Sequence, residues 1–209
     1  MNVLVFGATG ATGHELVSQA LAKGHRVTAF VRTPSKLGAL STRVTVAQGD
    51  VAHSAVAHAL DGQSAVLSAL GAASPLRRDP VLVDGVRHIV NAMEQMSVRR
   101  LVYLSFLGVQ EGRSQLRLVG RTLVARLILR HIVADHALKE EIIQRSRLDW
   151  VLVRPPRLTN GPRRGSYRHG SDIRATSIVP TISRADLADF MLRQLADDTY
   201  VRRAPAVIY

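Results

Sequence analysis

Short apolar runs alternate along the chain with segments whose apolar residues recur every three or four positions. The short runs carry few polar residues, which is typical of parallel strands buried on both faces. The predicted strands are Asn2–Phe6, Arg26–Val31, Val44–Gln48, Ala65–Leu70, Leu101–Leu104, Trp150–Val153 and, at an edge, Ala206–Ile208. The predicted helices are 14–22, Ala52–Leu60, Pro80–Met96, Leu116–Val133, Asp135–Arg145 and Ser183–Leu195, with a loop over 157–177.

Strands that alternate with helices predict an α/β fold, a Rossmann-type doubly wound parallel sheet with helices on both faces. No repeat or linker interrupts the pattern, so we expect residues 1–209 to form a single domain. The composition agrees, because 46% hydrophobic and 21% charged residues are enough for a core and argue against disorder.

The composition also excludes several chemistries. The chain has no cysteine, which excludes disulfides, thiol catalysis and cysteine-bound metals. Its histidines lack the spacing of metal ligands, and we expect no metal site. No apolar run approaches the roughly 18 residues of a membrane-spanning helix, and the first residues form a strand pattern and not a leader. We therefore expect a cytoplasmic protein.

A glycine-rich turn follows the first predicted strand and opens a helix. Gly7 permits the tight turn, Gly10 lets backbone N–H groups approach a pyrophosphate, and Gly13 lets the helix pack closely on the strand. The helix N-terminus favours the anion. This context predicts a dinucleotide site built from Gly7, Thr9, Gly10, Ala11, Thr12 and Gly13. The alternative is a tight turn that binds no ligand.

The second strand indicates which dinucleotide binds. NAD sites place a carboxylate there for the ribose 2′-hydroxyl, but this chain has no acidic residue between Glu15 and Asp50. Arg32 ends the strand and Lys36 follows four residues later. A guanidinium and an ammonium suit a 2′-phosphate, so we expect NADP(H). The alternative for Arg32 is a solvated surface side chain.

Residues after the later strands complete the predicted cofactor crevice. Asp50, followed by Val51, can accept a hydrogen bond from the adenine amino group or cap a helix. The small Gly71, after Leu70, would let the backbone pass close to ribose or nicotinamide. Arg154 and Pro155 end the sixth strand, and the proline turns the chain over the nicotinamide region. The cofactor-binding candidates beyond the glycine turn are Arg32, Lys36, Asp50, Val51, Leu70, Gly71, Arg154 and Pro155.

These residues lie in stretches that resemble the atypical short-chain dehydrogenase/reductases of the NmrA-like branch, and most of all the biliverdin reductase B (flavin reductase) subgroup. The stretches are VFGATGATG (5–13), FVRTPSKL (30–37), QGDV (48–51), GQSAVLSALG (62–71), GVRHIVNAM (85–93), DWVLVRPP (149–156) and SRADLADFML (183–192). The resemblance implies a Rossmann fold, NADPH binding and hydride transfer to a flavin, tetrapyrrole or quinone-like acceptor.

The chain departs from that family at the catalytic positions. The Tyr-x-x-x-Lys pair of typical members is absent, and alignment back from Arg154 places His136 at the lysine position and Ile132 at the tyrosine position. The second of two hydroxyl residues after the fifth strand is Phe106, so Ser105 alone remains. Ser105 and His136 are the catalytic candidates, as hydrogen-bonding groups or, for a protonated His136, as a general acid. The alternatives are a strand-end turn serine and a helix-start surface histidine.

The net charge of +12 is uneven, because residues 99–174 carry 16 basic and 6 acidic residues. We expect the substrate-side elements mainly in 105–177, where the arginines either form an anion-collecting rim or a solvated basic loop. The basic apolar segment 116–133 suits a cap over the cleft or a homodimer contact more than a membrane surface. Without a recognition motif or aromatic platform, the charge alone does not indicate nucleic-acid binding. An NADPH-dependent reductase, monomeric or homodimeric, is the leading function, and an NADP(H)-sensing regulator is the alternative.

Overall fold

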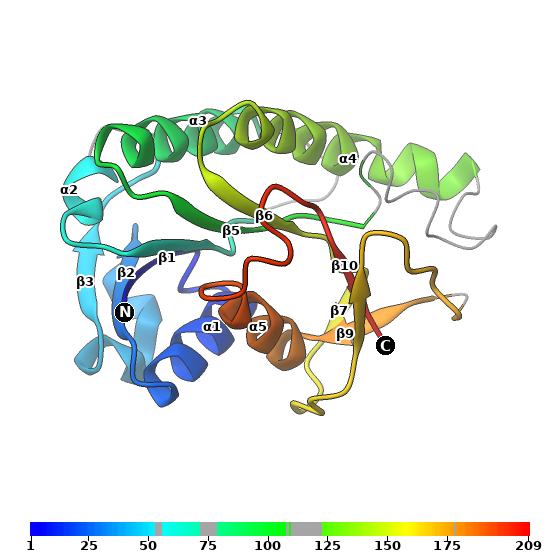
Figure 1. Cartoon of the computed structure of the whole chain (residues 1–209), viewed down its shortest axis with the longest axis horizontal. Helices are drawn as coiled ribbons and strands as arrows, with labels where there is room; N and C mark the ends of the chain where they lie inside the picture. Colours follow the sequence, from blue (N-terminus) through cyan, green and yellow to red (C-terminus); the bar gives the residue numbers. More distant parts are fainter. Residues whose placement is uncertain (53–55, 72–78, 108, 110–122, 178) are drawn as a thin grey trace.

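The computed structural model describes residues 1–52, 56–71, 79–107, 109, 123–177 and 179–209. Its centre is a six-stranded parallel sheet of order β3-β2-β1-β4-β5-β6 (Figure 1). The strands are β1 (Asn2–Phe6), β2 (Arg26–Val31), β3 (Thr45–Gln48), β4 (Ala65–Ser68), β5 (Arg100–Leu104) and β6 (Asp149–Val153). The helical segments are α1 (Ala11–Ala22), η1 (Pro34–Thr42), α2 (Val56–Leu60), α3 (Pro80–Gln95), α4 (Leu123–Gln144) and α5 (Arg184–Arg193).

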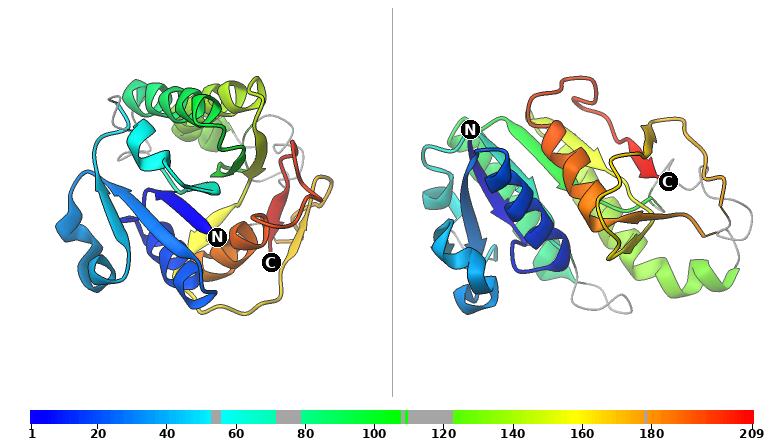
Figure 2. Two further views of the ribbon diagram at one scale, coloured as in Figure 1. Left: turned by 60° about the vertical axis from the view of Figure 1, so that its left-hand side comes forward. Right: turned by 90° about the horizontal axis from the view of Figure 1, so that it is seen from below.

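Both faces of the sheet are covered, as the apolar strands predict. Along β1, Val3 and Val5 pack in a core with residues of α1 and α5. Leu4 and Phe6 point the other way, into a core shared with α3 and the end of α4. Figures 1 and 2 show the two helical layers on opposite sides of the sheet. This arrangement confirms the predicted doubly wound fold.

The strand order reverses between β1 and β4, which pair side by side in the middle of the sheet. Ligands of open α/β sheets bind outside the carboxyl ends of the strands at such a point. The Ala69 N–H donates to the Phe6 carbonyl across 2.9 Å, so the turns after β1 and β4 begin next to each other. The fold therefore places the glycine turn at the edge where a ligand is expected.

One prediction about the helices is wrong. The structure has a single helix α4 from Leu123 to Gln144 where two were expected, and residues 116–122 of the first lie outside the described residues. The sequence around Asp135 contains no glycine or proline, so nothing there ends the helix. His136 consequently lies within α4 and not at a helix start. In the described part of the chain, no helix is long and apolar enough to cross a membrane.

The region predicted as loop contains short strands. These are β7 (Arg157–Thr159) and β8 (Arg168–Gly170). A third short strand, β9 (Thr181–Ser183), follows the predicted loop and lies parallel to β7. Each has three residues, too few for a recognisable alternation. The predicted last strand is confirmed as β10 (Ala206–Ile208), which pairs antiparallel with β8. The segment before β10 hydrogen-bonds to the edge of β6 through the Arg203 and Pro205 carbonyls.

Candidate functional site

The glycine turn has the backbone that its sequence predicts. Gly7 has a φ of +76°, and a Cβ atom there would lie 2.6 Å from the Ala69 carbonyl oxygen. A Cβ on Gly13 would lie 2.0 Å from the Gly7 carbonyl oxygen, closer than any side chain tolerates. Both positions therefore require glycine. A Cβ atom on Gly10 would lie 3.4 Å from the Gly7 carbonyl oxygen, which packing tolerates. We therefore expect Gly10 to matter for access to a ligand more than for packing.

The N-terminus of α1 has the properties of an anion site. Gly10 occupies the N-cap position, no side chain there bonds to the first turn, and the turn contains no acidic residue. The backbone N–H groups of Ala11, Thr12 and Gly13 precede the first internal helix bond, which His14 donates to the Gly10 carbonyl. These groups and the helix dipole favour a phosphate at this end of α1.

Two cations follow β2, the strand beside β1. The side chains of Arg32 and Lys36 are both exposed, while the backbone between them is fixed by a 3.1 Å bond from the Lys36 N–H to the Thr33 carbonyl. The Arg32 carbonyl accepts a hydrogen bond from the Gln48 amide at 3.5 Å. The backbone is thus held in place while both charges stay accessible, as recognition of a 2′-phosphate requires.

The remaining cofactor candidates lie at the same edge. Asp50 Oδ1 accepts from the Ala52 N–H at 3.0 Å. The Val51 carbonyl lies 2.9 Å from His88 Nδ1, and a Cβ on Gly85 would lie 2.5 Å from the Val51 side chain. Leu70 and Gly71 follow β4, and Gly71 borders open space. Residues 72–78, which come next, lie outside the described residues.

A buried ion pair occupies the carboxyl ends of β5 and β6. Arg154 and Glu140 are almost fully buried, and their side chains are joined twice, at 3.1 Å through Nε and 2.7 Å through Nη2. The Ser105 hydroxyl donates to Glu140 Oε1 at 2.5 Å. The carboxylate therefore joins β5, β6 and α4. Ser105 and Arg154 make internal contacts here, and Pro155, also buried, accepts from the Leu107 N–H.

His136 lies one helical turn before Glu140 on α4. Its ring lies 6.4 Å from the Phe106 ring, and its Nδ1 is shielded from solvent with no hydrogen-bond partner among the described residues. Burial, helped by the neighbouring Lys139 ammonium, lowers the pKa of His136 to about 3. The imidazole is therefore neutral near pH 7, and the imidazolium needed for a general acid is not populated there.

Glu140 is a residue of the site that was not predicted from the sequence. Nothing in its local sequence sets it apart from Glu141, which pairs with Arg145 on the exposed side of the helix. A signal existed elsewhere, because an arginine that ends a buried strand needs an acidic partner. Arg154 could have prompted the search for one.

Two arginines of the segment that was expected to form either a rim or a solvated basic loop contact α5. Arg163 pairs at 2.9 Å with the buried Asp189, which also lies 3.7 Å from the Lys23 ammonium. Lys23 is the C-cap of α1, about 18 Å along that helix from the glycine turn. The Arg164 backbone N–H donates to Asp186 on α5. The Arg163 guanidinium is therefore held away from the glycine turn.

The comparisons with known proteins agree with this geometry. A family model described as NAD(P)H-binding matches residues 7–198. The chain belongs to this NAD(P)H-binding family. Its structure is similar to ChuY, an anaerobilin reductase from Escherichia coli O157:H7, with 22% identity and a TM-score of 0.83 over 100% of this chain and 97% of the other. A short-chain dehydrogenase/reductase from Veillonella parvula in complex with NADP has 18% identity and a TM-score of 0.82 over 99% and 93%.

Curated proteins are also similar in sequence to this NAD(P)H-binding protein. A 3-diazoavenalumate denitrifying reductase from Streptomyces is 38% identical over 123 residues, which are 49% of this chain and 36% of the relative. The uncharacterized protein YwnB from Bacillus subtilis is 26% identical over 177 residues, 82% of this chain and 80% of YwnB. The chain spans about a third of the length of the first curated relatives that it matches.

Replacing Arg32 tests the basis of cofactor choice. We expect the wild type to bind NADPH more tightly than NADH by about 2–4 kcal/mol, the scale of charge-assisted hydrogen bonds to a phosphate. In Arg32→Ala most of this preference should disappear while NADH affinity changes little. Calorimetric titration of both cofactors into both proteins measures it. Equal affinity of the wild type for the two cofactors would contradict the predicted recognition of the 2′-phosphate.

The lowered pKa of His136 predicts a pH dependence of stability. The unfolded chain binds this proton near pH 6.5 and the folded chain near 3, so unfolding takes up a proton between these values. The contribution of neutral His136 to the free energy of unfolding is fully present above pH 6.5. It decreases as the pH falls below 6.5, by at most about 1.4 kcal/mol per pH unit. His136→Gln should therefore reduce the loss of unfolding free energy between pH 6.5 and pH 5. An unchanged loss in urea titrations would contradict the assignment.

Proposed function

We propose that the protein is an NADPH-dependent reductase that transfers hydride to a flat conjugated acceptor, such as a flavin, quinone or tetrapyrrole. One observation carries the proposal: the Ser105 hydroxyl, which lies beside the predicted nicotinamide position, already donates its hydrogen bond to the buried Glu140. Reduction of an isolated carbonyl needs a positioned acid, and the family's Tyr-x-x-x-Lys pair is absent. Hydride transfer to a conjugated acceptor depends more on positioning.

The cofactor end supports the same proposal. The Gly7–Gly13 turn and the uncapped N-terminus of α1 would hold the pyrophosphate, with Arg32 and Lys36 on the 2′-phosphate. Bound NADPH supplies the hydride. The chain's own residues orient the cofactor, and His136, with Phe106, would contribute a neutral, largely apolar surface near the acceptor. The anaerobilin reductase with the same fold is consistent with a tetrapyrrole-like acceptor.

An NADP(H)-sensing regulator of the NmrA type is the second candidate. The same observation favours it, because a site in which neither Ser105 nor His136 offers a free proton also suits a protein that binds the cofactor without turnover. The two functions share the cofactor edge and differ in whether the bound cofactor is oxidised.

An acceptor panel separates the two candidates. NADPH binding is measured by its fluorescence, and NADPH oxidation is then followed with riboflavin, flavin mononucleotide, menadione and biliverdin. The reductase predicts oxidation with at least one acceptor, saturable in that acceptor and lost in Gly13→Ala. Tight NADPH binding without oxidation by any acceptor would favour the regulator.

Substitution of the two catalytic candidates tests their roles. We expect Ser105→Ala and His136→Ala each to slow acceptor reduction about tenfold, and not by the 10²–10⁴ typical of a lost general acid or base. Both residues would then position the cofactor or acceptor. Steady-state rates at saturating NADPH measure the effect. A loss beyond about 10⁴ in His136→Ala, with NADPH binding intact, would identify His136 as the essential acid.

A further inference from the structure

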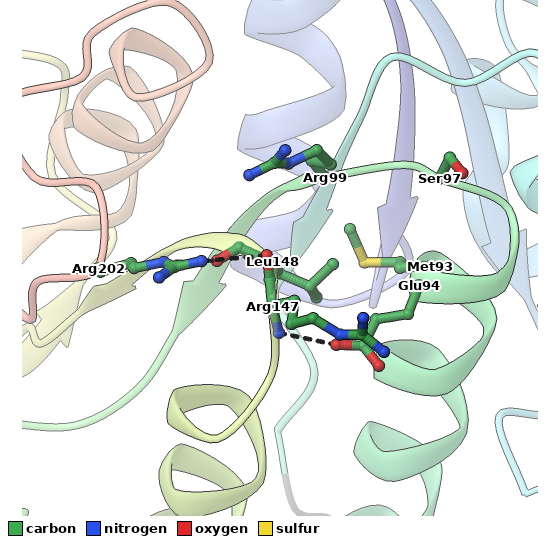
Figure 3. Close-up of a pocket in the computed structure, with 7 residues that line it drawn as sticks. All are labelled: Met93, Glu94, Ser97, Arg99, Arg147, Leu148 and Arg202. Carbon is green, nitrogen blue, oxygen red and sulfur yellow. Dashed lines mark hydrogen bonds between the residues drawn. The ribbon is translucent and has the colours of Figure 1, made fainter.

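A hollow of about 440 Å³ lies at the edge of the sheet opposite the glycine turn. Its residues come from the end of α3, the start of β5, the start of β6 and the turn before β10 (Figure 3). They are Met93, Glu94, Ser97, Arg99, Arg147, Leu148 and Arg202. β5, with five residues, separates this edge from Ser105 by about 17 Å. The hollow is therefore separate from the predicted cofactor crevice.

The hollow joins apolar and cationic surfaces. Met93 and Leu148 lie almost fully buried beneath the hollow, while Arg99, Arg147 and Arg202 are exposed and bring guanidinium groups and apolar methylene stems from three separate segments. Figure 3 shows the arginines spread around Leu148. A ligand that fits must combine an apolar body with a negative group.

Hydrogen bonds fix the Arg202 side chain and the backbone of the segment that carries Arg147. Arg202 has a φ of +56°, and its guanidinium donates to the Leu148 carbonyl at 3.3 Å and the Arg147 carbonyl at 3.2 Å. The Arg147 N–H donates to Glu94 Oε1 at 2.7 Å. A non-glycine residue at positive φ is uncommon, and such residues gather at functional sites. Fixing these segments in advance reduces the entropy that binding would cost.

The charges at the hollow do not cancel. Arg99 is neutralised by Asp149, with Nε 3.1 Å from Oδ2. Neither Arg147 nor Arg202 has an ion pair with a carboxylate in the part of the chain that the structure describes. Glu94 is the one acidic residue of the lining, so the two guanidiniums of Arg147 and Arg202 outnumber its single carboxylate. An anion is thus favoured over a neutral ligand.

We propose that this hollow binds a small amphiphilic anion, with a carboxylate, phosphate or sulfonate group on a flat or aliphatic apolar body. The apolar body would lie against the methylene stems of the arginines, over the buried Met93 and Leu148, and its charged group between Arg147 and Arg202. The volume is in the range of small-molecule pockets, which favours such a ligand over a nucleic acid or a peptide. This site gives part of the basic excess a role that the cofactor edge does not use.

The test uses a matched pair of fluorescent probes, anilinonaphthalene sulfonate and the neutral phenylnaphthylamine. The protein is first saturated with NADP⁺, which is not fluorescent, to block the cofactor edge. The sulfonate should then bind about tenfold more tightly than the neutral probe, as expected for a partly exposed charged contact. Displacement of the sulfonate by NADP⁺ would overturn the proposal, because the probe would then occupy the cofactor crevice.

Variants assign the contact to the arginines. Arg147→Ala and Arg202→Gly should each weaken sulfonate binding about fivefold and leave the neutral probe unchanged. Glycine at 202 keeps the positive φ, so this variant removes the guanidinium with little backbone strain. Arg87→Ala is the matched control, since Arg87 pairs with Asp84 on the exposed face of α3. This variant should change the affinity of neither probe. Unchanged NADP⁺ affinity shows that each variant is folded.

Methionine NMR locates the probe directly. The chain has four methionines, and Met93 lines the hollow whereas Met191 lies in the other core with α5. With methyl-labelled methionine, the sulfonate should shift the Met93 signal, assigned by Met93→Leu, and leave the Met191 signal in place. A shift of Met191 without Met93, or Arg variants that bind the sulfonate as the wild type does, would overturn the proposal.

Discussion

Gly13→Ala should abolish measurable NADPH binding and destabilise the fold. The added Cβ would lie 2.0 Å from the Gly7 carbonyl oxygen and 2.7 Å from the Ala8 Cα atom, and backbone atoms cannot rotate aside as a flexible side chain can. Either α1 moves off β1 or the turn opens. We expect the free energy of unfolding to fall by about 3 kcal/mol, and NADPH affinity to fall at least about 100-fold because a displacement near 1 Å misplaces the phosphate N–H donors.

Gly161→Ala is the control for this variant. A Cβ there would make ordinary contacts of 3.8 Å with Ser183 and Thr159, and its φ is not in the left-handed region. Its NADPH affinity and denaturation midpoint should stay near the wild-type values. If Gly13→Ala also binds NADPH as the wild type does, the close packing of α1 on the turn is not what forms the phosphate site.

Glu140→Gln should produce the largest loss of stability among side-chain substitutions outside the glycine turn. Glu140 is fully buried and accepts from both Arg154 and Ser105, so the amide would remove the carboxylate that pairs with a buried guanidinium. Removing one member of a buried ion pair costs about 3–5 kcal/mol. Urea-induced unfolding measures the change. Glu141→Gln, next along α4 and partly exposed with Arg145, should cost less than about 0.5 kcal/mol.

A double substitution separates the charge from the packing. Glu140→Met combined with Arg154→Met removes both charges and keeps apolar volume, so it should be more stable than Glu140→Gln alone. If Glu140→Gln costs less than about 1 kcal/mol, the pair does not fix α4 against β5 and β6.

The fold could be predicted from the sequence because its signals are local and repeated. Each apolar strand is followed by a segment with helical periodicity. The glycine turn requires a close approach of backbone segments that only glycine allows, as the contacts at Gly7 and Gly13 show. The start of α5 was equally readable, since Ser183 caps it by accepting from the Asp186 N–H.

The catalytic half of the site could not be predicted in the same way. The state of Ser105 depends on Glu140, 35 residues away along the chain, and on Arg154 from a third element. The pKa of His136 depends on how deeply α4 packs, which sequence spacing does not give. Arg163 lies in a segment that was predicted as a loop. Its partner Asp189 is a buried residue of α5, and the helical pattern of the sequence does not show that this carboxylate faces inward.

A single-turnover reaction tests the central claim most directly. The protein is loaded with NADPH that carries deuterium at the transferred position, mixed with an excess of an acceptor found in the panel, and followed at the cofactor and acceptor absorbances. The account predicts that NADPH is consumed in step with acceptor reduction, that deuterium at the transferred position slows both changes equally through a primary kinetic isotope effect, and that the rate changes little between pH 6 and 8. NADPH that stays bound and unoxidised, or deuterium that is retained in the NADP⁺ formed, would contradict direct hydride transfer from that position in this site.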